Sequence, residues 1–382
     1  SDLNPFVGLK PYSENESDFY FGRDQEVENL LQVLQKNKLL TLSGDSGAGK
    51  TSLINAGLIP RLKNGFMGQA GKDWSIACFR PGIDPLSNLA HALTFNDVLT
   101  VDNKPNTTDY KYYSEIISNY KALGIVEIYK RSEIYNTKNL LIVIDQLEDL
   151  FRFEHYFDTT LREDDNDLMD MIYRSVTFKN TAIYFIISIQ GFYLTKLTPY
   201  NKLQEIISQS QYSIQNLDYV GINQILEETF HKHTITFDSK VVELFIETLN
   251  EKISCLPNFQ FLLHKLYEKY VISGVEKQRI DIHDIEELGG ISNAISTDFE
   301  THYEGLDEID KNKISLFFKG LKDAQNPSID SNYNKVLSNS EYINISVIEL
   351  STIIRGLKLK FNDFVEIFEP SISGIPISEI KP

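Results

Sequence analysis

The sequence predicts an α/β fold in which a parallel β-sheet is covered by helices on both faces. Short apolar runs alternate along the chain with longer stretches of helical periodicity, which is the pattern of strands joined by crossover helices. The runs hold few polar residues, as do strands that are buried on both faces. The predicted strands are residues 39–43, 74–79, 139–144, 181–189 and 212–214.

The length of 382 residues predicts two or three domains. We expect the sheet to lie in a domain over residues 1–216 and a helical bundle domain to follow over residues 217–304, where only helices are expected. A third unit is expected over residues 305–382. Two apolar helices followed by a strand at residues 361–368 give it the pattern of a winged helix, and a plain helical extension fits this stretch almost as well.

The composition excludes several classes of protein. A formal net charge of −17 argues against direct binding of nucleic acid or of an anionic membrane. No apolar run approaches the roughly 20 residues that cross a bilayer. Cys78 and Cys255 lie in apolar contexts, so we expect two buried thiols in a reducing compartment, the cytoplasm. The chain begins at Ser1 and not at Met, which indicates a processed or excised fragment.

A glycine-rich loop at residues 44–51 has the spacing G-x-x-x-x-G-K-T of a phosphate-binding P-loop. It follows an apolar run and precedes good helix sequence, which favours a P-loop over a Gly-rich turn that matches the spacing by chance. Glycine lets backbone N–H groups turn inward around phosphate oxygens, and the helix N-terminus adds positive charge. The predicted nucleotide-binding residues here are Gly44, Asp45, Ser46, Gly47, Ala48, Gly49, Lys50, Thr51 and Ser52.

Two side chains of this loop and one acid further along the chain predict a nucleotide site with Mg²⁺. Lys50 would reach the β- and γ-phosphates, and the Thr51 hydroxyl would join the Mg²⁺ shell. Asp145 ends the apolar strand of residues 139–144, which is the Walker B pattern. Its carboxylate would hold Mg²⁺ through water, opposite Thr51.

The residue after Asp145 is Gln146, where many ATPases have the glutamate that polarises water. Glu148 is the nearest carboxylate that we expect in this catalytic role, and Asp149 is a weaker candidate. Either acid could instead stabilise the positive end of the following helix. Gln190 stands just after the strand of residues 181–189, where a polar residue senses the γ-phosphate in P-loop ATPases.

An apolar-apolar-Gly-Arg element lies one helix ahead of the P-loop, and in several P-loop ATPase families such an element packs beside the adenine. Residues 5–12 lie further upstream and could instead merely cover an edge of the sheet. Arg80 ends the second strand, and because the carboxyl ends of parallel strands face the ligand, it would point toward nucleotide or a partner. A structural ion pair accounts for Arg80 equally well. The predicted adenine-side residues are Phe6, Val7, Phe21, Gly22 and Arg23.

With these pieces in place, the chain resembles the novel STAND NTPase family, the signal transduction ATPases with numerous domains that are related to AAA+ proteins and to NLR regulators. The family head runs about Pro-Tyr-x-Gly-Leu-Arg-Pro-Phe and then Phe-Phe-Gly-Arg, which residues 4–12 and 20–23 match. Its Arg-Pro-Gly and Asp-Gln-Phe-Glu-Glu elements match residues 80–82 and 145–149. Its Leu-Pro helix and Leu-Gly-Gly-Ile element match residues 256–266 and 288–291, so the resemblance spans roughly residues 4 to 300.

Two departures from the family pattern bear on activity. The family usually has Arg-Ser-Asp-Phe after the sensor strand, and here its arginine is Gln190 and its aspartate is Phe192. Loss of a cation near the γ-phosphate would weaken the stabilisation of transition-state charge, so we expect a slow ATPase. NLR-type relatives often hold ADP with a histidine of the winged helix, and no histidine follows His302.

The resemblance implies an adenine-nucleotide switch with Mg²⁺. The ADP form would be closed, and exchange for ATP would open it and let protomers assemble, for signalling or bacterial antiviral defence. Sensor and effector domains or partners would lie outside this chain. Pro257 would contact the nucleotide near adenine from the helical domain, although its simpler role is to start a helix.

Two other functions compete with this one. The chain could be an interaction scaffold with a vestigial nucleotide site. It could also be an ordinary P-loop kinase or GTPase, but the sequence has no Asn-Lys-x-Asp guanine signature and no Asp-x-x-Gly after the third strand.

Overall fold

The structure is a computed structural model, and it describes residues 3–68, 71–82, 84–95, 98–101, 110–152, 160–251, 255–305, 307–309, 311–312 and 315. The chain divides into two compact units. We call residues 11–232 with 246–256 the sheet unit, and residues 1–10 and 233–245 with the described residues from 257 onward the helical unit. The predicted domain limits at 216 and 304 stay a prediction.

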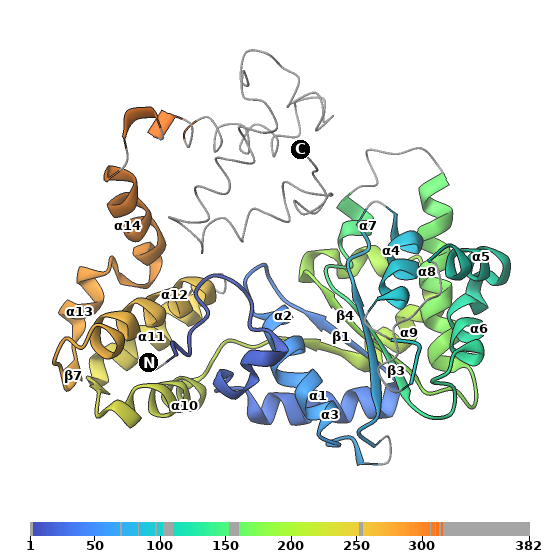
Figure 1. The fold of residues 1–382 in the computed structure, drawn as a ribbon, viewed down its shortest axis with the longest axis horizontal. Helices are drawn as coiled ribbons and strands as arrows, with labels where there is room; N and C mark the ends of the chain where they lie inside the picture. Colours follow the sequence, from blue (N-terminus) through green and yellow to red (C-terminus); the bar gives the residue numbers. More distant parts are fainter. Residues whose placement is uncertain are drawn as a thin grey trace. The chain divides into compact units, whose positions relative to one another are not determined.

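A five-stranded parallel sheet forms the centre of the sheet unit (Figure 1). Its strand order is β2-β3-β4-β1-β5, and every neighbouring pair is parallel. The strands lie within one or two residues of the predicted positions, so the predicted parallel sheet is confirmed. They are β1 (Leu39–Ser43), β2 (Trp74–Phe79), β3 (Asn139–Ile144), β4 (Ile183–Ile189) and β5 (Gln211–Ser213).

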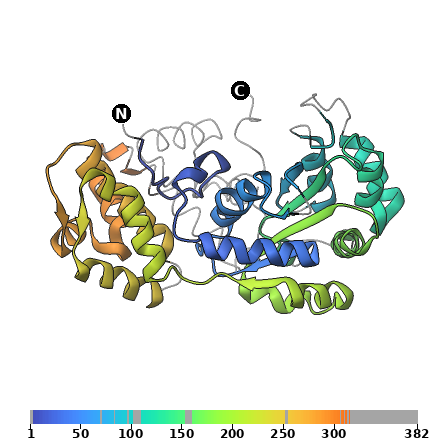
Figure 2. The same cartoon turned by 90° about the horizontal axis from the view of Figure 1, so that it is seen from below.

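Helices cover both faces of this sheet. Figure 2 shows the blue helices α1 to α3 and the teal helices α5 and α6 on opposite sides of the strands. The helices of the sheet unit are α1 (Asp24–Asn37), α2 (Lys50–Ser52), the π-helical η2 (Leu53–Leu58), α3 (Ile59–Lys63), α4 (Pro85–Thr94), α5 (Tyr110–Tyr120), α6 (Gly124–Arg131), α7 (Asp149–Arg152), α8 (Thr160–Thr177), α9 (Asn201–Ser210) and α10 (Tyr219–Thr229). Short 3₁₀ turns lie at η1 (Glu14–Phe19), η4 (Lys121–Leu123) and η5 (Gly191–Leu197).

Alternate side chains of each central strand enter two different hydrophobic cores, because successive residues of a strand point to opposite faces. In β3, Leu140 and Ile142 lie in a core with side chains of α4, α5, α6, α8 and α9. Leu141 and Val143 lie in a second core with side chains of α1, η2 and α3. Burial of the sheet on both faces explains why its strands read as continuous apolar runs.

The helical unit contains a short element that the sequence does not reveal. A two-residue parallel pair joins β6 (Thr236–Phe237) and β7 (Arg279–Ile280), so the expectation of helices alone after residue 217 is wrong here. Two residues are too few to show the alternation of apolar and polar residues by which a strand is recognised in a sequence. Three of the described helices run across the limit between the two units, namely the 3₁₀ turn η6 (His231–His233), α11 (Ser239–Glu251) and α12 (Leu256–Tyr267). The helices that lie within the helical unit are the π-helical η8 (Glu268–Ile272), α13 (Ile282–Glu287) and α14 (Gly290–Glu304).

Three further expectations have different outcomes. The helical bundle stays a prediction, and the winged-helix-like unit of residues 305–382 lies almost entirely outside the described residues.

Cys255 is buried, but Cys78 is exposed on β2, so the predicted burial is wrong for Cys78. The reason is that β2 is an edge strand of the sheet. Within the described part of the chain, no helix is both long enough and apolar enough to span a membrane.

Candidate functional site

The P-loop connects β1 to α2 at the carboxyl edge of the sheet, as the sequence predicts. Gly47 and Gly49 adopt φ angles of 80° and 90°, in the left-handed region that favours glycine. A side chain at Gly49 would also bring a Cβ within 3.1 Å of Leu256 Cδ2. The backbone conformation therefore favours glycine at position 49, and an added Cβ would also require the Leu256 side chain to shift by a few tenths of an ångström.

The Lys50 side chain is folded back along this loop. Its ammonium donates hydrogen bonds to the backbone carbonyls of Gly44 at 2.7 Å and Asp45 at 2.8 Å, and the residue is buried. Ser52, at the end of α2, accepts a hydrogen bond at 3.1 Å from the backbone N–H of Tyr12. The loop and the start of its helix are thus held by several independent contacts.

The Thr51 hydroxyl lies beside the carboxylate of Asp145, at 3.4 Å from Oδ1 and 3.3 Å from Oδ2. The two residues are 94 positions apart in sequence, and β4 lies between the strands β1 and β3 that carry them. The Asp145 backbone N–H donates to Phe79 at 2.9 Å, which fixes the end of β3 against β2. The predicted metal-binding pair is therefore brought together.

Ser188, which no sequence motif marks, holds the Asp145 carboxylate in place by hydrogen bonds. Its hydroxyl donates to Asp145 Oδ1 at 2.5 Å and accepts from the Gln146 backbone N–H at 2.8 Å. Gln146 itself has a φ of 58°, which is uncommon for a residue other than glycine. The one sequence feature that could have indicated Ser188 is a hydroxyl residue near the end of the buried apolar strand β4, which lies between β1 and β3.

The oxygen atoms gathered here fit Mg²⁺. A hydroxyl and a carboxylate are hard ligands, and Mg²⁺ at nucleotide sites takes only one or two protein ligands besides phosphate and water. Within the described ranges, no group of three or more His, Cys, Asp or Glu side chains could hold a metal by itself. Thr51 and Asp145 would hold Mg²⁺ together with a bound nucleotide, and the ion would neutralise charge on its phosphates.

Arg80 forms an ion pair with the same aspartate. Its guanidinium Nη2 lies 3.5 Å from Asp145 Oδ2, and 43% of its side chain is exposed. The structure therefore contains the ion pair that the sequence left as one of two accounts for Arg80. The pair also places a cation at the edge of the predicted metal site.

Glu148 and Gln190 lie next to each other. The Glu148 carboxylate accepts a hydrogen bond from the Gln190 backbone N–H at 3.1 Å, and Glu148 is only 1% exposed. This contact fixes the segment that follows β4. A catalytic role for Glu148 stays a prediction, and Asp149, the weaker candidate, begins the short helix α7.

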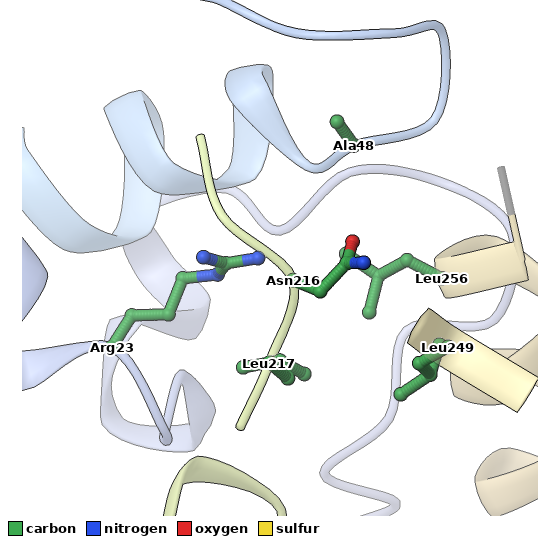
Figure 3. Close-up of a pocket in the computed structure, with 6 residues that line it drawn as sticks. All are labelled: Arg23, Ala48, Asn216, Leu217, Leu249 and Leu256. Carbon is green, nitrogen blue, oxygen red and sulfur yellow. The ribbon is translucent and has the colours of Figure 1, made fainter. Parts of the chain in front are cut away.

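A small pocket lies beside the P-loop, and Arg23 and Ala48 are the predicted nucleotide residues that line it (Figure 3). The buried Arg23 forms an ion pair with Glu26, and its Nη1 donates to the Gln215 carbonyl at 3.0 Å. Burial works to lower the pKa of Arg23, but the neighbouring Tyr20 and Glu26 outweigh it, and the pKa is raised above its usual value. The lining residues that sequence reasoning missed are Asn216, Leu217, Leu249 and Leu256.

The other predicted adenine-side residues are divided between the two units. Gly22 lies in the sheet unit with a φ of 88°, and a Cβ on it would meet the Gly221 carbonyl at 2.7 Å. Phe21, partly buried, precedes it. Phe6, Val7 and Pro257 belong to the helical unit.

Phe6 has two contacts with α12 within the helical unit. Its ring centroid is 6.1 Å from that of Tyr267, and its carbonyl lies 2.6 Å from His264 Nδ1. Pro257 lies in the first turn of α12. Contact of Phe6, Val7 and Pro257 with adenine stays a prediction.

A comparison with protein families decides the family of this chain. The sequence profile described as Novel STAND NTPase 1 matches residues 5–341. The chain belongs to the Novel STAND NTPase 1 family. The match includes the P-loop, Asp145 and the residues of the pocket, so this STAND protein contains a nucleotide-binding NTPase module.

Solved structures with a similar chain trace are distant from this STAND protein. The Aeropyrum pernix ORC1 protein in complex with DNA has a TM-score of 0.47 and 12% identity, covering 90% of this chain and 84% of its own. The Walker-type ATPase PABY2304 of Pyrococcus abyssi has a TM-score of 0.44 and 12% identity, covering 92% of both chains. The Aeropyrum pernix ORC2 protein in ADPNP–ADP complexes has a TM-score of 0.47 and 12% identity, covering 88% and 85%. A search of the curated proteins found no match. The assignment to the family rests on the profile and the site, not on these structures.

Proposed function

We propose that this chain is the ATP-operated switch module of a STAND protein. Adenine nucleotide binds at the P-loop with Mg²⁺, is hydrolysed slowly, and ADP–ATP exchange controls opening and self-association. The observation that carries the proposal is the juxtaposition of Thr51 with Asp145 at 3.3 Å beside the Lys50 loop. These are the groups that a P-loop NTPase uses on the β- and γ-phosphates and on Mg²⁺.

The γ-phosphate is the only chemical difference between the two nucleotides. A ligand shifts an open–closed equilibrium only by its difference in binding free energy between the two states. Lys50, Thr51 and Asp145 are the groups proposed to bind that phosphate and its metal ion. The switch therefore depends on contacts at this edge of the sheet.

The proposed slow turnover follows from Gln190. Its side chain is a neutral amide at a position where the family usually has arginine. An arginine that faces the transferred phosphoryl group stabilises the charge of the transition state strongly. Without this cation, we expect the module to remain in its ATP state for longer.

The proposed role is in cytoplasmic signalling or bacterial defence, with self-association in the ATP state. Sensor and effector domains or partners are proposed to lie outside this chain. The net charge of −17 supports neither nucleic acid nor an anionic membrane as a direct ligand.

Nucleotide identification and light scattering test this function. Nucleotide released from the purified protein by denaturation is expected to be ADP or ATP by mass spectrometry. After exchange, size-exclusion chromatography with light scattering is expected to show a larger species with ATP than with ADP when the flanking domains are present. Identical monomers with both nucleotides would contradict the assembly part of the proposal.

Lys50→Ala tests the use of the site. We expect this variant to lose nucleotide binding and the ATP-dependent mass increase. Lys63→Ala is the matched control, because Lys63 also lies near the P-loop helix in sequence but pairs only on the surface with Glu14, at 2.5 Å. The alternative is an interaction scaffold with a vestigial site, which the neutral side chains of Gln146 and Gln190 favour. In that case Lys50→Ala would leave partner binding unchanged.

A further inference from the structure

The pocket beside the P-loop is mostly apolar. Leucine and alanine side chains supply most of its lining, and Arg23 and Asn216 are the two polar residues among its six lining residues. Figure 3 shows the Asn216 amide between Arg23 and Leu256, with Ala48 of the P-loop above it. An apolar pocket with a few fixed polar groups is the usual form of a small-molecule site.

The backbone on both sides of Asn216 is fixed. Before it, the Gln215 carbonyl accepts the hydrogen bond from Arg23, and the Ile214 N–H donates to Ser43 at 2.9 Å. After it, Asp218 accepts from the Gly221 N–H at 2.8 Å and caps α10. Asn216 is therefore held at the carboxyl end of β5 with little freedom of the main chain.

The Asn216 amide itself has no hydrogen-bond partner within the part of the chain that the structure describes. The only other polar lining group, the Arg23 guanidinium, contains donors alone and is already bound to Glu26 and to Gln215. Asn216 is thus the lining side chain that can both donate and accept toward a ligand in the pocket.

The chemistry of an amide matches one edge of adenine. An asparagine side chain presents a donor and an acceptor next to each other. Adenine presents its 6-amino donor next to a ring-nitrogen acceptor, and asparagine binds this pair with two hydrogen bonds. Guanine presents two acceptors, O6 and N7, on its corresponding major-groove edge, and an amide can satisfy only one of them.

We propose that Asn216 is the residue that selects adenine. Its amide oxygen accepts a hydrogen bond from the 6-amino group, and its amide nitrogen donates to the neighbouring ring nitrogen. The leucine side chains of the pocket contact the apolar faces of the base. This inference rests on the proposed binding of nucleotide at the P-loop, since Ala48 belongs to both the P-loop and the pocket lining.

The test compares two triphosphates on three proteins. ATP and purine riboside 5′-triphosphate differ only in the 6-amino group, and their dissociation constants are measured by calorimetry. We expect the unmodified protein to bind ATP roughly tenfold more tightly or better, because purine riboside 5′-triphosphate leaves the Asn216 amide oxygen without its donor. In Asn216→Leu this ratio falls to about one through loss of ATP affinity, because leucine keeps the volume without the hydrogen bonds. Gln215→Ala is the matched control and keeps the ratio, since the side chain of Gln215 is exposed and its backbone contact with Arg23 remains.

A second variant guards against misfolding. Asn216→Asp keeps the shape and an acceptor for the 6-amino group but loses the donor to the ring nitrogen, so we expect weaker binding of both triphosphates at an unchanged ratio, and its melting temperature is compared with the parent. If Asn216→Leu retains the ratio of the unmodified protein, or if Asn216→Asp binds both triphosphates as tightly as the unmodified protein, the assignment of Asn216 is overturned. If the unmodified protein binds neither triphosphate, the proposed function fails as well, and this outcome is distinct from binding without selection.

Discussion

Replacement of Ser188 by alanine is a sharp test of the site, because one hydroxyl bridges the Asp145 carboxylate and the Gln146 backbone. The variant loses a hydrogen bond to a charged group at 2.5 Å and one from an N–H at 2.8 Å. The first kind of bond contributes about 1.5–3 kcal/mol and the second about 0.5–1.5 kcal/mol. We therefore expect a loss of roughly 2–4 kcal/mol, and a fall in melting temperature of at least about 4 °C for a unit of this size.

The same variant is expected to weaken metal binding. Removal of a group that orients a metal ligand typically lowers metal affinity by about 10–100-fold. A Mg²⁺ titration of nucleotide-loaded Ser188→Ala should therefore show an apparent affinity about tenfold or more below that of the parent. Thermal unfolding without nucleotide measures the loss of folding stability separately from metal binding.

Thr41→Val is the matched control for this experiment. Thr41 is also fully buried in a central strand, but its hydroxyl has no hydrogen-bond partner among the described residues. Replacing that hydroxyl by a methyl group is expected to leave the melting temperature unchanged or to raise it. If Ser188→Ala behaves like Thr41→Val in both assays, the bridging role of Ser188 is wrong.

Two further variants test contacts around the site. Arg80→Ala removes a half-exposed cation from Asp145, so we expect the apparent Mg²⁺ affinity of the nucleotide-loaded protein to rise about two- to fivefold. A Mg²⁺ titration that shows a lower apparent affinity than the parent would contradict this. Gly221→Ala places a Cβ 2.6 Å from the Gly22 carbonyl, so we expect a loss of about 1–3 kcal/mol in urea unfolding. Gly191→Ala, where the added Cβ meets nothing within 4 Å, is its control, and equal midpoints for the two would refute the close approach.

Local sequence predicted the parts of the site whose residues are close together in the chain. The P-loop, its flanking strand and helix, and Asp145 at the end of an apolar run all follow from spacing and periodicity. These signals are reliable because a buried strand and a glycine nest each demand particular residue types within a few positions.

The missed residues depend on which strands become neighbours. Ser188 contacts Asp145 only because β4 lies between β1 and β3, and a linear sequence does not give the strand order. Asn216 lines the pocket because Arg23, nearly two hundred positions earlier, binds the carbonyl next to it. The exposure of Cys78 likewise follows from the edge position of β2 and not from its apolar context.

The use of adjacent β3 residues for two separate cores limits how this chain can change in length. Deleting a single residue between Leu140 and Val143 would exchange the two sets of side chains and turn Asp145 away from Thr51. One such event would therefore remove the fold and the metal site together. Insertions and deletions are tolerable in the connections between elements, while within β3 only substitution is open to the protein.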